Sequence, residues 1–222
     1  MSGVRSFAAM KMVGVNVAAD PLFTYAYMQV HGGFVFVSAD DPGMHSSQDE
    51  QDNRNFARFA KICMFEPSDS QEAKDMTRAA YDVSERFHVP VMVRMTTRIC
   101  HSKSLVTEQE RVPAPPIPYT RRTGEIDSVP AVARVRRVII EQRQKKLQEW
   151  SETCPWNVEE PGDTSIGIVT SGAGYNYVKE VFGDSVSVLK IGFSYPLPMK
   201  KIPAFAEKVD TLYAVEELDS FM

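Results

Sequence analysis

The sequence lacks several features that would assign it to a function class directly. No apolar run approaches the roughly 20 residues of a membrane-spanning helix, and the first residues show no secretory signal pattern. Only three cysteines occur, Cys63, Cys100 and Cys154, and their spacing fits neither a disulfide framework nor a zinc or iron–sulfur site. We therefore expect reduced, packed thiols in a cytoplasmic protein.

Positive charge is also in short supply. The 222 residues carry 25 Lys and Arg against 29 Asp and Glu, which gives a formal net charge of −4. This balance argues against general nucleic-acid binding, because such binding depends on neutralising phosphates. With 43% hydrophobic residues, the chain has the composition of a soluble globular protein with one or two ordinary cores.

Apolar strand patterns alternate with helical patterns over the first hundred residues. The expected strands are residues 4–10, 34–39, 63–65 and 91–93, and the expected helices are residues 16–30, 48–60 and 71–87. This alternation predicts a doubly wound, mostly parallel α/β sheet with helices on both faces. Phe56 and Phe59 fall on the buried face of the second helix, and Ser68 or Ser70 is expected to cap the third.

The composition changes after residue 107. Residues 112–118 are rich in proline and predict an extended connector, which marks a domain boundary. Residues 129–150 then predict one long helix. Its basic residues are Arg134, Arg136, Arg137, Arg143, Lys145 and Lys146. Because the chain is net acidic, we interpret them as a solvated face rather than a nucleic-acid contact.

A second, smaller α/β unit is expected at the end of the chain. Its strands are residues 165–170, 186–191 and 211–215, and its helices are residues 175–182 and 199–208. The turn Ser171-Gly172-Ala173-Gly174 is compatible with a helix cap or with a phosphate-binding loop. Since neither GxGxxG nor GK[ST] is present, we favour the cap, and small-nucleotide binding through Ser171 and Gly172 is the weaker alternative.

The densest polar segment, residues 40–54, directly follows the expected strand 34–39. Asp41-Pro42-Gly43 predicts a turn, after which Ser46 or Ser47 would cap a helix and Glu50 would return a bond to that cap. Ligands bind at the carboxyl ends of strands in an open α/β sheet, so this segment is a candidate site. Local physics leaves a capped turn with solvated charges as the alternative.

Residues 39–54 resemble a signature of the alpha subunits of indolepyruvate ferredoxin oxidoreductases, which belong to the 2-oxoacid:ferredoxin oxidoreductase superfamily of thiamine-diphosphate enzymes. Further stretches that resemble this family are residues 66–73, 90–98, 101–104, 168–172 and 215–219. The resemblance spans nearly the whole chain. One departure is Asp49, where asparagine is expected.

The resemblance implies three segments. Residues 1–107 would form a pyrimidine-binding-type α/β domain that is incomplete at its N-terminus, residues 108–163 a connector with the long basic helix, and residues 164–222 a transketolase C-terminal-like α/β domain. The implied activity is oxidative decarboxylation of aryl pyruvates such as indolepyruvate to acyl-CoA. A non-catalytic docking or remnant protein with the same fold is the alternative.

The resemblance also implies cofactors and partners. Thiamine diphosphate and Mg²⁺ would be shared with a missing domain, and [4Fe-4S] clusters would be carried elsewhere in the complex. The expected partners are the remaining alpha-subunit domains or split chains, a beta subunit, ferredoxin, CoA and a 2-oxo acid, in an oligomer without nucleic acid or membrane. The isolated chain is expected to be inactive.

Within the chain, the candidate site residues fall into three groups. His45, which can exchange protons near neutral pH, and Glu50 are the expected catalytic residues. The expected cofactor-binding residues are Asp40, Asp41, Ser46 and Gln48, and those expected to bind a substrate carboxylate are Arg94, Arg98 and His101. No residue is assigned to a metal. A surface role for His45, and pairing of a strand-end arginine with Asp40 or Asp41, remain alternatives.

Overall fold

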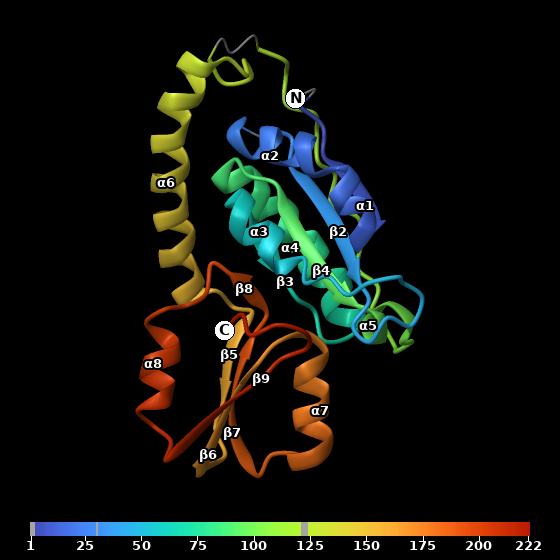
Figure 1. Ribbon diagram of the computed structural model, residues 1–222, viewed down its shortest axis with the longest axis vertical. Helices are drawn as coiled ribbons and strands as arrows, with labels where there is room; N and C mark the ends of the chain where they lie inside the picture. The colour runs from blue at the N-terminus through green and yellow to red at the C-terminus, as the bar shows by residue number, and fades with distance from the viewer. Residues whose placement is uncertain (1–2, 30, 121–123) are drawn as a thin grey trace.

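The computed structural model describes residues 3–29, 31–120 and 124–222 (Figure 1). The helices are α1 (Met12–Val17), α2 (Ala19–Tyr27), α3 (Arg54–Ala60), α4 (Ser70–Phe87), α5 (Thr97–His101), α6 (Pro130–Thr153), α7 (Gly172–Phe182) and α8 (Lys201–Ala206). The strands are β1 (Ser6–Lys11), β2 (Phe34–Asp40), β3 (Cys63–Phe65), β4 (Val91–Thr96), β5 (Asn157–Glu160), β6 (Asp163–Thr170), β7 (Val186–Ile191), β8 (Phe193–Tyr195) and β9 (Thr211–Val215). No helix in these ranges is long and apolar enough to cross a membrane.

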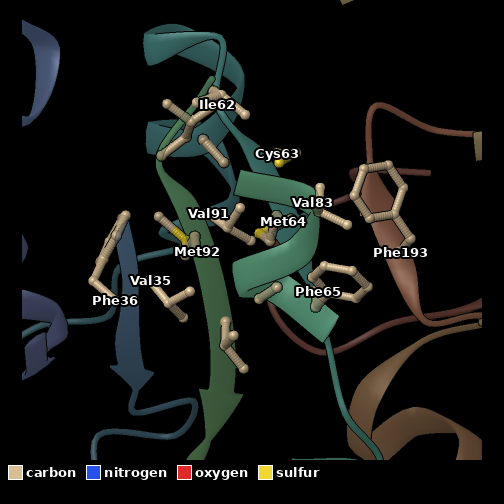
Figure 2. Packing of buried hydrophobic residues seen from close by; sticks show 14 of the residues in the cluster. Val35, Phe36, Ile62, Cys63, Met64, Phe65, Val83, Val91, Met92 and Phe193 are labelled. Carbon is tan, nitrogen blue, oxygen red and sulfur yellow. The ribbon is translucent and has the colours of Figure 1, made fainter. Parts of the chain in front are cut away.

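The strands of the first sheet lie in the order β1-β2-β4-β3-β8. Strands β1 to β4 are parallel, whereas β8 runs antiparallel to β3. The central strands are buried on both faces, as parallel strands covered by helices should be. Val35, Phe36, Met64 and Met92 are at most 2% exposed and pack together in the core (Figure 2).

The second sheet has the order β5-β7-β6-β9, in which only β5 is antiparallel to its neighbour. Its core lies around Ile168, Val188 and Leu189, and α7 and α8 pack against it. The prediction of an α/β fold with mostly parallel sheets is therefore confirmed.

Aromatic side chains pack β8 and α6 against the core of the first sheet. Phe193 of β8 contacts Phe65 of β3, with ring centroids 5.0 Å apart, and Trp150 of α6, with centroids 4.7 Å apart. Phe193 is fully buried (Figure 2). A strand from the last quarter of the chain thus completes the first core, while the division of the chain at residues 107 and 163 stays a prediction.

Several expected helices have different bounds in the structure. The segment expected as one helix over residues 16–30 forms two helices, because Ala18 leaves the helical conformation and Pro21 then occupies the first turn of α2. Residue 30 lies outside the described residues. The expected helix 48–60 begins only at Arg54, and Phe59 is 76% exposed rather than buried. Helix α8 is shorter than the expected 199–208.

The cap of α4 is neither Ser68 nor Ser70. Asp69 is the N-cap, and its side chain accepts a hydrogen bond of 2.8 Å from the backbone N–H of Glu72. Ser68 instead donates through Oγ to the Glu72 carboxylate at 2.7 Å. Asp69 is the cap because its carboxylate lies three residues before Glu72, whose backbone N–H group has no partner within the helix.

The basic face of α6 is only partly solvated. Arg136 and Arg143 are buried, contrary to expectation, and donate to the carbonyls of Tyr27 and Ala26 at 2.6 and 2.8 Å. These carbonyls belong to the last turn of α2, where helix acceptors lack intrahelical partners. Two buried arginines therefore fasten the long helix to the first sheet's helical layer.

The cysteines are reduced. Cys63 and Cys154 are buried, and burial raises the pKa of each thiol to about 12. Cys100 is exposed, so the expectation of a packed thiol is wrong at this position. It lies in α5, a short helix at the end of β4 that the sequence pattern did not predict.

Candidate functional site

A cleft of about 1020 Å³ lies at the carboxyl edge of the first sheet. Its walls come from the end of β2 and the loop after it, from the start of the segment leading into α4, from α5, and from α7 of the second unit. Helices α5 and α7 approach each other at this edge (Figure 1). The lining residues are Lys11, Ala39, Asp40, Asp41, His45, Ser46, Ser68, Asp69, Thr97–Ser102, Ser104, Ala173, Asn176 and Tyr177.

Asp41 organises the loop that forms one wall of the cleft. Its carboxylate accepts hydrogen bonds from Ser47 Oγ at 2.7 Å, from Thr97 Oγ1 at 2.7 Å and from the Ser46 backbone N–H at 2.8 Å. The bonds from Ser47 and Thr97, followed by that from Ser46, hold the pKa of Asp41 well below its usual range. An anionic Asp41 therefore ties this loop to the start of α5.

The two serines of this loop do not cap a helix. The Ser46 backbone N–H and the Ser47 hydroxyl both donate to the Asp41 carboxylate. The next helix begins only after Asn53. Glu50 does close the turn, since its carboxylate accepts a hydrogen bond from the backbone N–H of Gly43. Gly43 has φ +79°, a conformation that glycine adopts without strain. The predicted turn is present, but the predicted capping box is wrong.

Beneath the cleft floor lies a buried ion pair between Asp40 and Arg94. Arg94 Nε donates to Asp40 Oδ2 at 2.7 Å, and the side chains are 3% and 0% exposed. Asp40 also accepts from the backbone N–H of Asn53 at 3.0 Å. Burial raises the pKa of Asp40, although the charge of Arg94 acts in the opposite direction.

The ion pair extends into a buried charged cluster, which comprises Asp40, Asp52, Arg54, Glu66, Arg94 and Glu216. Arg94 Nη1 donates to Glu66 at 2.5 Å. Arg54 Nε donates to both oxygens of Asp52 at 2.9 Å, and Arg54 Nη1 donates to Glu216 at 2.8 Å. Because Arg54 also donates to the carbonyls of Glu217 and Asp219, the cluster holds the C-terminal segment against the first sheet.

Contacts across the cleft hold α7 in place. Asn176 Nδ2 donates to the carbonyl of Ser68 at 2.5 Å. Lys190 Nζ donates to Ser68 Oγ at 2.8 Å and to Glu72 at 2.6 Å, and it lies 3.9 Å from the centre of the Tyr175 ring. Ser171 occupies the N-cap position of α7 as expected, but no capping bond from its side chain occurs in the described structure.

The structure brings some of the predicted site residues together and separates others. Among the described residues, the cleft is lined by Asp40, Asp41, Ser46, His45, Arg98 and His101, whereas Gln48, Glu50 and Arg94 do not line it. For Arg94, the pairing with Asp40 that the sequence left open is the arrangement found. The catalytic, cofactor and substrate roles themselves stay predictions.

Sequence reasoning missed the cleft residues on the opposite wall. Ser68 and Asp69 come from the segment before α4, and Ala173, Asn176 and Tyr177 come from one face of α7. The spacing 173, 176 and 177 places all three on one helix face, but that pattern does not say what the face contacts. Only the folded chain shows that α7 closes this cleft.

Comparisons with known proteins give a consistent result. Residues 2–146 match the family described as pyruvate flavodoxin/ferredoxin oxidoreductase, thiamine diphosphate-binding. The chain is 41% identical over 227 residues to the indolepyruvate oxidoreductase subunit IorA of Methanothermobacter marburgensis and 40% identical over 228 residues to that of Archaeoglobus fulgidus. All of this chain is covered, but only 37% and 36% of those relatives.

Solved structures show a similar fold. The 2-oxoglutarate:ferredoxin oxidoreductase of Magnetococcus marinus matches with a TM-score of 0.64 and 15% identity, covering 98% of this chain and 46% of that one. A transketolase of Pichia stipitis matches with a TM-score of 0.54 and 14% identity, covering 97% of this chain and 27% of that one. At these identities the likeness concerns the fold alone.

Proposed function

This chain belongs to the pyruvate flavodoxin/ferredoxin oxidoreductase family, within the thiamine diphosphate-binding region, and from this premise we propose that it is part of an indolepyruvate-type alpha subunit. The complete enzyme would decarboxylate aryl 2-oxo acids oxidatively to acyl-CoA and pass the electrons to ferredoxin. A beta subunit and [4Fe-4S] clusters elsewhere in the complex would complete the electron path. The chain's own contribution would be one wall of the active site.

The observation that carries this proposal is the cleft at the carboxyl edge of the first sheet. Ligand sites of open α/β sheets lie at this edge. The Asp40, Asp41 and His45 segment that resembles the family signature lines the cleft, and Arg98 lines it from α5. The family resemblance and the geometry therefore point to the same place on the molecule.

The lining residues fit the ring end of thiamine diphosphate better than its diphosphate end. The cleft is large enough for a heterocycle, and Ser46, Ser102 and Ser104 offer neutral hydroxyl groups. Asp41, whose pKa is lowered by its hydrogen bonds, keeps a negative charge that would disfavour a diphosphate at its own wall, although Lys11 lies 3.6 Å from it. We therefore assign the ring end to this chain and the diphosphate to another part of the enzyme.

Magnesium would be held with the diphosphate, outside this wall. Across residues 3–29, 31–120 and 124–222, no group of three or more His, Cys, Asp or Glu side chains is arranged to hold a metal ion. The relatives are more than twice as long as the matched span, so they have room for a diphosphate and metal domain. We propose a site shared between two parts of the enzyme.

The residues of this chain would bind and orient the substrate. Bound thiamine diphosphate supplies the nucleophilic carbon and the electron sink that decarboxylation requires. Arg98 and His101 are exposed on α5 and would pair with the substrate carboxylate, while His45 would move a proton at the mouth of the cleft. Helix α7, which already lines one side of the cleft, would shield the reacting atoms from water.

The test is reconstitution of a complete enzyme. We would express this chain with the remaining segments of the Methanothermobacter marburgensis relative and a beta subunit, and measure ferredoxin reduction with indolepyruvate, phenylpyruvate and pyruvate. We expect a higher kcat/KM for the two aryl acids. A higher kcat/KM for pyruvate rejects the indolepyruvate assignment, and no activity in an assembled, cofactor-loaded complex favours the docking alternative.

The chain on its own should neither oxidise a 2-oxo acid nor bind thiamine diphosphate tightly. Titration calorimetry with thiamine diphosphate and Mg²⁺ checks this directly, because the proposal places the groups that hold the diphosphate elsewhere. Micromolar or tighter binding by a monomer contradicts the assignment of this chain to a single wall.

A further inference from the structure

Helix α7 presents an aromatic side chain to the cleft. Tyr177 is 41% exposed, and among the described residues that line the cleft it is the one Phe, Tyr or Trp. Ala173 and Asn176 lie beside it on the same helix face. Because Asn176 is fastened to Ser68, the backbone that carries Tyr177 is fixed relative to the first sheet.

The neighbouring wall of the cleft, formed by α5, has a different chemistry. Arg98 lies on α5, is exposed, and forms no ion pair with a carboxylate in the described part of the chain. Helices α5 and α7 are in contact. An unpaired guanidinium and an exposed aromatic ring therefore lie on two walls of one cleft, which Ala39 and Ala173 also line with small side chains.

A ligand that satisfies both walls has a carboxylate at one end and an aromatic ring at the other. A guanidinium pairs with a carboxylate through two parallel hydrogen bonds. An aromatic ring gains both apolar burial and ring–ring contact against a tyrosine. A short aliphatic 2-oxo acid such as pyruvate would satisfy the guanidinium but would leave the Tyr177 ring uncovered.

We infer that Tyr177 is a specificity-determining residue, which contacts the aryl group of the substrate while Arg98 pairs with its carboxylate. This inference rests on the proposed function and names the residue that makes the enzyme prefer aryl acids. The ring would add binding energy for aryl acids alone. Its removal should therefore change the preference rather than the chemistry.

The experiment compares substrates in the complete, cofactor-loaded enzyme. Tyr177→Ala should lower kcat/KM for indolepyruvate and phenylpyruvate by roughly 10- to 100-fold, mainly through KM, and change that for pyruvate by less than about 3-fold. Tyr177→Phe keeps the ring and should keep the preference. Tyr213→Ala is the matched control, since Tyr213 is 54% exposed on β9 and does not line the cleft.

A binding measurement gives a second readout that does not depend on turnover. Calorimetry should show that Tyr177→Ala weakens binding of 3-indolepropionate, an unreactive aryl carboxylate, but not of propionate. An unchanged ratio of aryl to aliphatic affinity overturns the inference, and so does an equal loss for both classes. If the unsubstituted enzyme oxidises no 2-oxo acid at all, the proposed function fails, while the binding ratio still decides the role of Tyr177.

Discussion

Arg94 and Arg98 come from the same stretch of chain but occupy opposite environments. Arg94, on β4, is 3% exposed and pairs with Asp40 and Glu66 beneath the cleft. Arg98, on α5, is exposed and lines the cleft. The difference arises because β4 ends at Thr96, so the following residues leave the buried layer of the sheet. Residues of one sequence motif can therefore divide into those that hold the fold and those that line a cleft.

The strongest test of this division is Arg94→Met. The substitution removes the cation that neutralises Asp40 and Glu66, and leaves two buried carboxylates without it. Removing one partner of a buried ion pair typically lowers the free energy of unfolding by about 3–5 kcal/mol, and we expect a loss of this size in urea denaturation. Arg98→Met is the control and should change the unfolding free energy by less than about 0.5 kcal/mol. Equal losses for both would show that the two arginines do not differ as described.

Arg98→Met should have the next largest effect, on activity rather than stability. Hydrogen bonds to charged groups contribute roughly 1.5–3 kcal/mol, so kcat/KM for 2-oxo acids should fall about 10- to 100-fold in the complete enzyme. Arg98→Lys keeps the charge but cannot form two parallel hydrogen bonds with a carboxylate, so kcat/KM should fall by less than in Arg98→Met. If steady-state kinetics leave KM unchanged in Arg98→Met, the carboxylate is bound elsewhere.

Local sequence pattern was sufficient for seven of the nine strands in the described structure, but not for β5, β8 or the long-range pairing of strands. Strands 63–65, 186–191 and 211–215 were predicted with the observed bounds, because each is a short apolar run between turn residues. Strands β5 and β8 were missed. Phe193 of β8 packs against Phe65 and Trp150, which lie far away in the sequence. Local periodicity does not predict such a contact.

The position of the candidate loop at the sheet edge was predictable, but its hydrogen-bond partners were less so. Residues 40–54 lie at the carboxyl edge of the sheet because they follow a buried strand, which the sequence makes clear. The expected cap by Ser46 or Ser47 was wrong because both residues donate to Asp41 instead. The sequence permits both patterns, in which the serines either cap a helix or donate to Asp41, and the folded structure adopts the second.

Asn176→Ala should have a smaller effect, because it removes one neutral hydrogen bond across the cleft. The amide of Asn176 bonds the carbonyl of Ser68, and the Lys190 contacts with Ser68 and Glu72 remain to hold the wall. A loss of about 0.5–1.5 kcal/mol in unfolding free energy is expected by urea denaturation. Glu180→Ala, on the exposed side of α7, is the control and should stay within about 0.5 kcal/mol of the unsubstituted chain.

The smallest effect concerns pH, because the pKa values of Asp40 and Glu72 shift in opposite directions. In the buried cluster, burial raises the pKa of Asp40, so this group favours the folded state more as the pH falls. In the contact between α4 and β7, burial alone would raise the pKa of Glu72, but the charge and hydrogen bond of Lys190 hold it below its ordinary 4.5. The two contributions to acid stability partly cancel.

Glu72→Gln separates these contributions. Between the lowered folded pKa of Glu72 and its ordinary value of 4.5, the unfolded chain binds more protons at this group than the folded chain does. Stability from Glu72 is therefore fully present above about pH 4.5 and is lost as the pH falls through the folded pKa. The difference in unfolding free energy between the unsubstituted chain and Glu72→Gln should be largest at pH 6 and should shrink steadily toward pH 3. Urea denaturation over this range measures the difference, and a value that stays constant with pH would contradict the ion pair between Lys190 and Glu72.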